Sequence, residues 1–295
     1  VTIVIFSLVH MAPGDPVQMM AGLDAKEEDI EALRAKMGMD KPLIVQYFNY
    51  VKGLLHLDLG KSIITNKNIS DEIFFRFRNT AELAVAGILI SSVFGIFIGI
   101  VAAVNRDRWL DKTLMSLSIT GISMPSFLLA LLLMLLLVSQ WHLLPASGRE
   151  GSPFTAEGFK YIILPALTLG ISGTASIARL TRSSVVAVLN EEFVMTLKAK
   201  GLRRKMILFK HILRNASLPI LTMNGLDFGY LLGGAVVTET IFEWPGIGKY
   251  AMDAISQNDF PAVQGAVLIL SMMFMLINLV VDLLYGVLDP RVSLE

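Results

Sequence analysis

The sequence has no cysteine and only four histidines among its 295 residues. Without cysteine it can form neither a disulfide framework nor a thiolate metal site, and it has no thiol nucleophile. The histidines are far apart and show no metal-ligand spacing; they are His10, His56, His142 and His211. Neither HExxH nor GxSxG occurs, so nothing in the sequence supports an enzyme.

Charge is also scarce, and its two signs balance. Charged residues make up 17% of the chain, and 25 Lys and Arg offset 25 Asp and Glu, so the formal net charge is zero. Soluble domains average about 25% charged residues. The balance excludes a nucleic-acid binder that relies on bulk positive charge. An apolar content of 54%, with a mean hydropathy of +0.63, excludes a disordered chain.

The apolar residues gather in long segments that are almost free of charge. The segments lie at 81–104, 113–138, 161–178, 216–238 and 262–281. Glu82 and Asp227 are the only charged residues within them. A bilayer core of about 30 Å requires about 20 apolar residues in a helix. Five segments near this length predict membrane spans, because buried helices of soluble proteins usually carry a polar stripe.

A further apolar segment stands at the start of the sequence. Residues 1–11 are apolar over about half the length of a span, and Pro13 and Pro16 then end any helix. A basic start and a small-residue cleavage site are both missing, so we do not interpret the segment as a signal peptide. We expect the sequence to begin part-way through a first span. The predicted fold is therefore all-α, a polytopic membrane protein with six transmembrane helices.

The loops predict how these spans are oriented. If the first span runs outward, the loops at 105–112, 179–214 and 289–295 are cytoplasmic and hold 3, 9 and 1 Lys or Arg residues. The outer loops at 12–79, 140–160 and 241–261 hold 9, 2 and 1. Short basic loops stay on the cytoplasmic side, so this orientation is favoured, with both termini cytoplasmic.

The predicted domain organisation follows from these spans. It consists of 1–11 as the end of the first span, 12–79 as an extracytoplasmic helical segment, 80–288 as a transmembrane domain with a cytoplasmic loop at 179–216, and 289–295 as a cytoplasmic tail.

The outer segment 12–79 carries its own helix signals. We expect one helix to begin at Asp24 and stop at Gly38, and a second to begin at Pro42. Ser70 is expected to cap a third helix, which leads into the second span.

The cytoplasmic stretch 190–219 is the most informative part of the sequence. Asn190 is expected to cap a helix over 191–200, and Gly201 to end it in the left-handed conformation. A helix of this length has only marginal stability in water, and it therefore needs a surface to pack on. Phe193 and Leu197 give it a small apolar face. Two interpretations are open: the helix lies on lipid headgroups, or it fits a groove of another protein.

This stretch resembles the EAA loop of ABC importer permeases, in particular the dipeptide, oligopeptide and nickel branch. The matching residues are Phe193, Thr196, Ala199–Gly201, His211, Leu213–Ala216 and Pro219. The Glu-Ala-Ala triplet itself is replaced by Met195, Thr196 and Leu197. Further motifs similar to this branch are Ala12–Pro16, Asp58–Ser62, Arg179–Ser183, Glu239–Gly248, Asp259–Pro261 with Gln264, and Asp289–Arg291.

The resemblance implies a type I ABC importer permease in a bacterial inner membrane. Its partners would be a homologous second permease, two cytoplasmic ATPases that bind ATP and Mg²⁺, and an extracytoplasmic solute-binding protein. This chain itself would bind no cofactor or metal. The coupling residues implied are Glu192, Phe193, Thr196, Leu197, Ala199, Lys200, Gly201, Arg214, Asn215 and Pro219. The residues implied in docking of the binding protein are Trp244, Pro245 and Gly246.

Asp227 is the candidate for the translocation pathway, because a charge within a span usually faces a bundle interior or a water-filled path. A structural pair with another span is equally open. Gly229 and Gly233 continue a glycine face that begins at Gly225 and permits close helix packing. This face either packs within the subunit or belongs to a pathway or gate at the interface between two permeases.

The substrate stays open at this stage. Members of the branch carry dipeptides, oligopeptides, glutathione or nickel chelates, and we expect di- or oligopeptides here. An ion-coupled secondary transporter is the alternative class. It is disfavoured because no inverted repeat is visible and few charges lie within the spans.

Overall fold

The computed structural model describes residues 1–11, 17–18, 26–36 and 38–288. The motifs Ala12–Pro16 and Asp289–Arg291, the expected helix start at Asp24 and the tail 289–295 lie outside these residues. Within them the chain is helical and contains no strand, apart from an isolated bridge between Lys61 and Asn68. The prediction of an all-α fold is confirmed.

The helices pack into two units. The first combines residues 1–80 with 245–272, and the second combines 81–244 with 273–295. Two helices, α5 (Ile69–Val104) and α14 (Phe260–Leu288), contribute residues to both units.

The first unit has a small apolar core formed by the start of α5, by α13 (Ile247–Ser256) and by the start of α14. Gly265 lets α14 approach α5 closely, because a Cβ there would lie 2.7 Å from Cγ2 of Ile69. The remaining helices of this unit are α1 (Thr2–Met11), α3 (Glu27–Lys36) and α4 (Leu43–Leu55). The Phe6 ring contacts Tyr47 edge-on, with 5.4 Å between centroids, and this contact joins α1 to α4.

Two of the three helix signals predicted in the outer segment are confirmed. Gly38 follows α3 with a φ of +69°, and Pro42 stands directly before α4. The cap predicted for Ser70 is wrong, because α5 already begins at Ile69. The Ser70 hydroxyl instead donates to the carbonyl of Leu57 at 2.7 Å and so holds the preceding loop.

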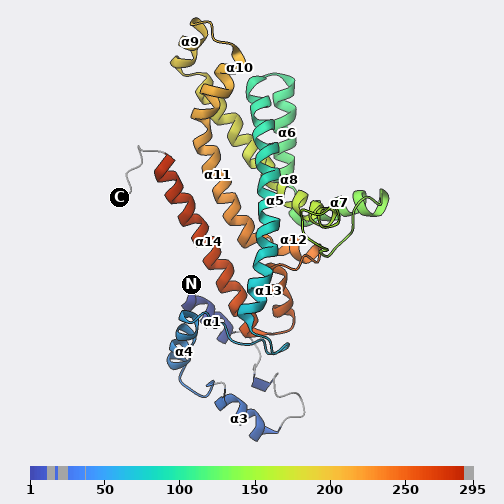
Figure 1. The fold of residues 1–295 in the computed structure, drawn as a ribbon, viewed down its shortest axis with the longest axis vertical. Coiled ribbons are helices and arrows are strands. Elements are labelled where there is room, and N and C mark those ends of the chain that lie inside the picture. The colour runs from blue at the N-terminus through green and yellow to red at the C-terminus, as the bar shows by residue number, and fades with distance from the viewer. Residues whose placement is uncertain (12–16, 19–25, 37, 289–295) are drawn as a thin grey trace. The chain divides into compact units, whose positions relative to one another are not determined.

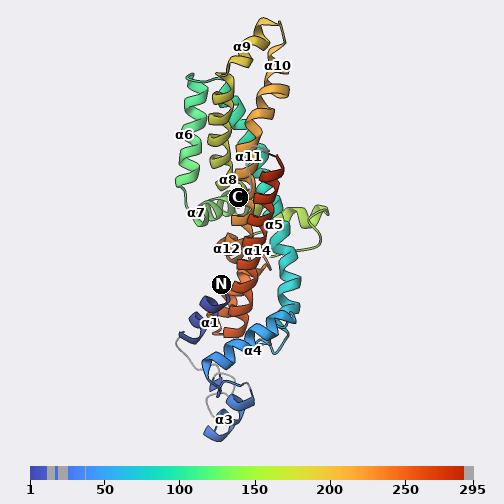
Figure 2. The same ribbon diagram turned by 90° about the vertical axis from the view of Figure 1, so that its left-hand side faces the viewer.

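The second unit is a bundle of long helices. Figures 1 and 2 both show α5, α6, α8 and α11 running side by side. The elements in chain order after α5 are α6 (Trp109–Ser123), α7 (Ser126–Leu133), the π-helical η1 (Met134–Gln140), α8 (Ala156–Leu189), α9 (Glu192–Ala199), α10 (Arg204–Met206), the π-helical η2 (Ile207–Ile212), α11 (Leu213–Gly234) and α12 (Val236–Ile241).

Three of the described helices are long and apolar enough to cross a bilayer: Ile69–Val104, Ala156–Leu189 and Phe260–Leu283. The segment predicted as a third span is bent by 104° between Trp109–Ser123 and Ser126–Gln140. Pro125 causes the break, because a residue before proline avoids the helical conformation and Met124 is extended, with a ψ of 123°. A proline inside a helical segment predicts a kink, and the structure shows a sharp bend at this one. The total of six spans stays a prediction.

Glycines bring α5 and α8 into direct backbone contact. A Cβ at Gly95 would lie 2.7 Å from Cβ of Ile177, and one at Gly99 would lie 2.5 Å from Cβ of Thr181. Gly170 of α8 lies in the same way against Ile90 of α5. No larger residue fits these positions unless the two helices separate.

We predict that Gly99→Ala lowers the free energy of unfolding by about 1–3 kcal/mol, because the new methyl group overpacks the contact with Thr181. Gly121→Ala in α6 is the matched control, since its Cβ would lie an ordinary 3.6 Å from Cβ of Ala175. Thermal unfolding of the purified, detergent-solubilised protein measures both. Equal stability of the two variants would contradict a close contact between Gly99 and Thr181.

Candidate functional site

The predicted cytoplasmic loop contains a short helix, α9, at the end of the second unit that is remote from α12 (Figure 1). Gly201 follows it with a φ of +76°, so the predicted left-handed stop is confirmed. The cap predicted for Asn190 is wrong. Asn190 still belongs to the end of α8, with φ −90° and ψ −3°, and Glu191 takes the N-cap position. The helix therefore has eight residues instead of ten.

The apolar face of α9 packs on its own subunit. Val194 is fully buried, and Phe193 and Leu197 pack beside it. The cluster that they join contains Ala103 from α5, with residues of α8, η2 and α11; those residues are Val185, Val188, Ile207, Ile212 and Ala216. The apolar face, for which the sequence left a partner protein or lipid open, therefore packs within the subunit, in a cluster with residues of the long helices.

The opposite side of α9 is open. We call it the loop surface; it consists of Glu192, Met195, Thr196, Ala199 and Lys200, all exposed. Met195 is 72% exposed and stands out as an apolar side chain among polar ones. Three further exposed basic residues follow at Arg203, Arg204 and Lys205.

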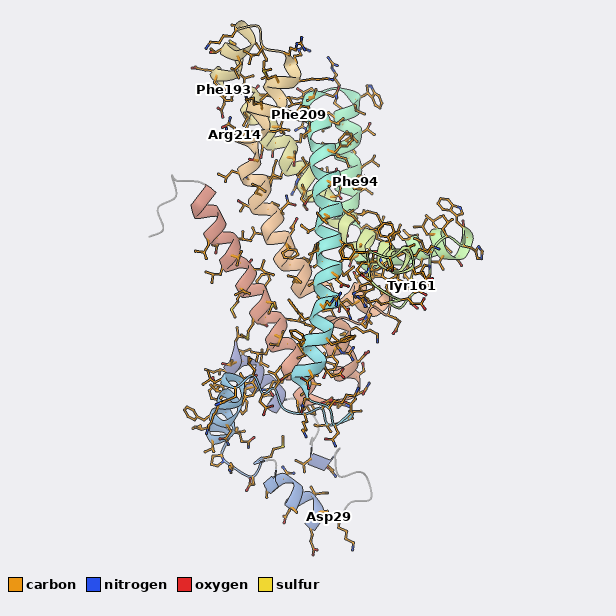
Figure 3. All side chains as sticks on the ribbon, viewed as in Figure 1. Asp29, Phe94, Tyr161, Phe193, Phe209 and Arg214 are labelled. Carbon is orange, nitrogen blue, oxygen red and sulfur yellow. The ribbon has the colours of Figure 1, made fainter. Side chains whose placement is uncertain are left out.

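The other predicted coupling residues lie beyond the loop surface. Arg214, Asn215 and Pro219 belong to α11 and are exposed. Asn215 donates from Nδ2 to the carbonyl of His211 at 2.8 Å, which ties the start of α11 to η2. Figure 3 shows Arg214 and Phe193 at the same end of the second unit.

Asp227 lies on α11 and lines a cavity of about 310 Å³. Its Oδ2 atom is buried and has no hydrogen-bond partner among the described residues. The cavity walls come from α5, α7, α8, α11 and α12; the other lining residues are Ser91, Met124, Ser126, Leu169, Ser172, Gly173, Ser176, Tyr230, Leu231 and Thr238. Sequence reasoning selected Asp227 but missed the serines, because they are scattered along three helices.

The glycine face of α11 points to α14. A Cβ at Gly225 would lie 2.5 Å from Cγ2 of Val281, and one at Gly229 would lie 3.3 Å from Oδ1 of Asn278. Gly233 lies more loosely against Phe274. None of these glycines lines the Asp227 cavity. Of the two roles that the sequence left open, the structure supports packing within the subunit.

The candidate docking residues lie at the turn that follows α12. Trp244 is 1% exposed and packs in the core of the second unit, with the Arg149 guanidinium 5.6 Å from its ring centroid. Its indole therefore contributes to packing inside the subunit. Gly246 is also buried, and Pro245 accepts a hydrogen bond on its carbonyl from Asn79 at 2.8 Å.

Sequence reasoning missed an ion pair that connects α6 to α8. Arg182 donates from Nε and Nη2 to the two carboxylate oxygens of Asp111, both at 2.6 Å. The Asp111 side chain is 3% exposed and also accepts from the backbone N–H of Asp107. Arg182 stands in the motif Arg179–Ser183, but nothing in the sequence marks Asp111 as its partner.

Two motifs that are distant in the sequence meet in the first unit. The Ser62 hydroxyl donates to Oδ2 of Asp259 at 2.5 Å, and Oδ1 of Asp259 accepts from the backbone N–H of Ile63 at 3.2 Å. The same oxygen accepts from Ala262 at 3.3 Å. Asp58–Ser62 and Asp259–Pro261 are thus two halves of one buried junction.

The long apolar helices define the class: a polytopic membrane protein. Residues 95–294 match the family model of the binding-protein-dependent transport system inner membrane component. Residues 1–84 match the model of the N-terminal part of such membrane components. The chain therefore belongs to the inner-membrane permease family of binding-protein-dependent ABC importers, which is a family of transport subunits and not of enzymes.

Individual relatives agree with this assignment. The chain is 42% identical over 292 residues to the glutathione transport system permease protein GsiC of Salmonella typhimurium strain LT2, covering 99% of this chain and 93% of the relative. It is 40% identical to GsiC of Escherichia coli strain K12, again over 99% of this chain and 93% of the relative. An inward-facing structure of the MetNI methionine ABC transporter matches with a TM-score of 0.58 and 15% identity, over 74% of this chain and 96% of the other. The fold is that of a type I ABC importer permease.

We predict that Asp259→Ala lowers the free energy of unfolding by about 2–4 kcal/mol, because two buried donors and one partly buried donor lose their acceptor. The control is Asp253→Ala, which removes only a partly exposed pair with Lys249 and should cost less than about 1 kcal/mol. Thermal unfolding compares the two variants. A similar loss in both would show that the junction does not stabilise the first unit.

Proposed function

We propose that this chain imports short peptides as one of two permease subunits of an ABC importer, and that glutathione is the first substrate to test. The observation that carries the proposal is the 42% identity, over nearly the whole chain, to a protein named as a glutathione transport permease. Di- and oligopeptides share the same backbone chemistry and complete the proposed substrate class.

The energy for transport comes from partner subunits in this proposal. The sequence has no Walker motif, so ATP and Mg²⁺ bind to two cytoplasmic ATPases. A homologous second permease completes the pathway, and a solute-binding protein delivers the substrate on the outer side. The basic residues beside α9 support a cytoplasmic position of this loop, with both termini on the same side.

Coupling follows from the two faces of α9. The loop surface contacts an ATPase, and the opposite face packs in the apolar cluster to which Ala103 of α5 and Val185 of α8 also belong. When ATP binding closes the ATPase pair, α9 moves with it. Because Val194 is buried in the shared cluster, this movement is passed to the ends of the long helices and changes the side to which the pathway opens.

Docking of the binding protein is proposed near the turn at Trp244–Gly246. Asn79 and Thr80 hold this turn and the residue after it: Asn79 donates to the carbonyl of Pro245, and the Thr80 hydroxyl accepts from the N–H of Ile247 at 2.9 Å. Such a fixed turn can pass contact with the binding protein directly into α5.

We predict ATP-dependent, vanadate-sensitive uptake of glutathione by the complete importer in proteoliposomes, with its own binding protein present. Labelled dipeptide and a nickel chelate are measured in parallel as rivals. Uptake of the nickel chelate alone would refute the peptide assignment. Uptake driven by an ion gradient without ATP would refute the importer mechanism.

We predict that Met195→Asp abolishes most of the ATP hydrolysis that is stimulated by the loaded binding protein, because a charge enters an apolar contact with the ATPase. Folding should be unaffected, since this side chain is exposed. Met195→Leu keeps the apolar character and is the matched control. Leu197 is a poorer probe, because it packs inward and its substitution would disturb the loop itself. Normal coupling in Met195→Asp would exclude the loop surface as the docking site.

A further inference from the structure

The cavity around Asp227 contains a carboxylate oxygen, Oδ2, that has no hydrogen-bond partner in the described part of the chain. A charged side chain in a membrane span, as residues 216–238 are predicted to be, normally pairs with another side chain or faces water. Among the residues that the structure describes, no side chain bonds to Oδ2 of Asp227, and the cavity wall contains no Lys, Arg or His. The site therefore carries an unbalanced negative charge on one wall.

Two of the hydroxyl groups in the wall, those of Ser91 and Ser172, add acceptors to this charge. Ser91 donates its hydrogen to the carbonyl of Ile88, and Ser172 donates to the carbonyl of Thr168, both at 3.1 Å. A hydroxyl has a single hydrogen, so both oxygens can offer only lone pairs to a ligand. A carboxylate and two such hydroxyls line one cavity and together match a group that has several N–H donors.

We propose that this cavity is a subsite for the ammonium group of the transported peptide. Asp227 is the counter-ion, and the oxygens of Ser91 and Ser172 accept the remaining N–H groups. The proposal rests on the proposed function and deepens it, because it names the part of the substrate that this chain recognises. Substrates with a free amino terminus fit, and an acylated amino group does not.

The size of the cavity and its apolar wall favour a peptide over a bare cation. A volume of about 310 Å³ is roughly ten times the share of one water molecule in the liquid. The rest of the wall includes Met124, Leu169 and Leu231, which suit the aliphatic part of an organic ligand and offer no oxygen ligand to a hard cation. An anionic group is disfavoured by the charge of Asp227.

The test is equilibrium binding of radiolabelled glutathione to the purified importer in nanodiscs, without the binding protein. The competitors are unlabelled glutathione and N-acetylglutathione. Sodium is tested as a further competitor by replacing the choline chloride of the buffer with sodium chloride. We expect N-acetylglutathione to compete at least about tenfold more weakly than glutathione, because it lacks the ammonium. We expect sodium not to compete.

Variants assign the effect to the cavity. Asp227→Asn should weaken glutathione binding about tenfold or more, and Asp227→Glu should restore part of it. Asp282→Asn is the matched control, since this carboxylate of α14 is exposed and lies outside the cavity; its binding should equal that of the unmodified importer. Ser172→Ala keeps the charge and should weaken binding a few-fold. It tests the proposal even if Asp227→Asn does not assemble.

The outcomes separate this inference from the proposed function. If the unmodified importer takes up neither glutathione nor dipeptide, the proposed function itself is refuted. If uptake is intact, three results would overturn only the ammonium subsite. They are the absence of saturable binding, equal competition by N-acetylglutathione and glutathione, and full binding by both Asp227→Asn and Ser172→Ala. Competition by sodium would assign the cavity to a cation instead.

Discussion

The close contact between α5 and α8 is the constraint on which the second unit depends. In a bilayer the lipid is as apolar as the side chains, so helices associate through tight packing and not through the hydrophobic effect. Gly95, Gly99 and Gly170 supply that packing by removing the side chains that would hold the backbones apart. The consequences reach both ends of the pair. At one end Gly173 brings Ser91 to the cavity wall, and at the other Ala103 joins the cluster that holds α9.

Much of this fold could be predicted from the sequence, because apolar runs and glycines act locally. The long helices, the stop at Gly201 and the break at Pro125 all follow from properties of adjacent residues. Contacts between distant residues could not be predicted in the same way. Spacing places Phe193 and Leu197 on one face of α9 but does not say which surface that face meets, and it meets the chain's own core. The pairing of Asp111 with Arg182 is equally invisible, since nothing local connects them.

The two-sided arrangement of α9 explains why the loop needs both an inner and an outer set of residues. An eight-residue helix is too short to be stable in water by itself. If its apolar face were reserved for a partner, the helix would have no fixed position before that partner binds. Packing Val194 into the subunit supplies the position and leaves Met195 and the polar residues free for contact. The same packing places α9 in one apolar cluster with Ala103 of α5 and Val185 of α8, which is the connection that the proposed coupling uses.

In the proposed ammonium subsite, a single carboxylate suits a transport step. Binding in a pathway has to be strong enough to admit the substrate and weak enough to release it on the other side. One charge-assisted contact contributes about 1.5–3 kcal/mol, which an ATP-driven change in the cavity wall can reverse. A second charge or a cage of oriented donors would hold the substrate in place. Since Asp227 shares its cavity with hydroxyls from separate helices, any shift of α5 or α8 relative to α11 separates these oxygens from the carboxylate and lowers the affinity.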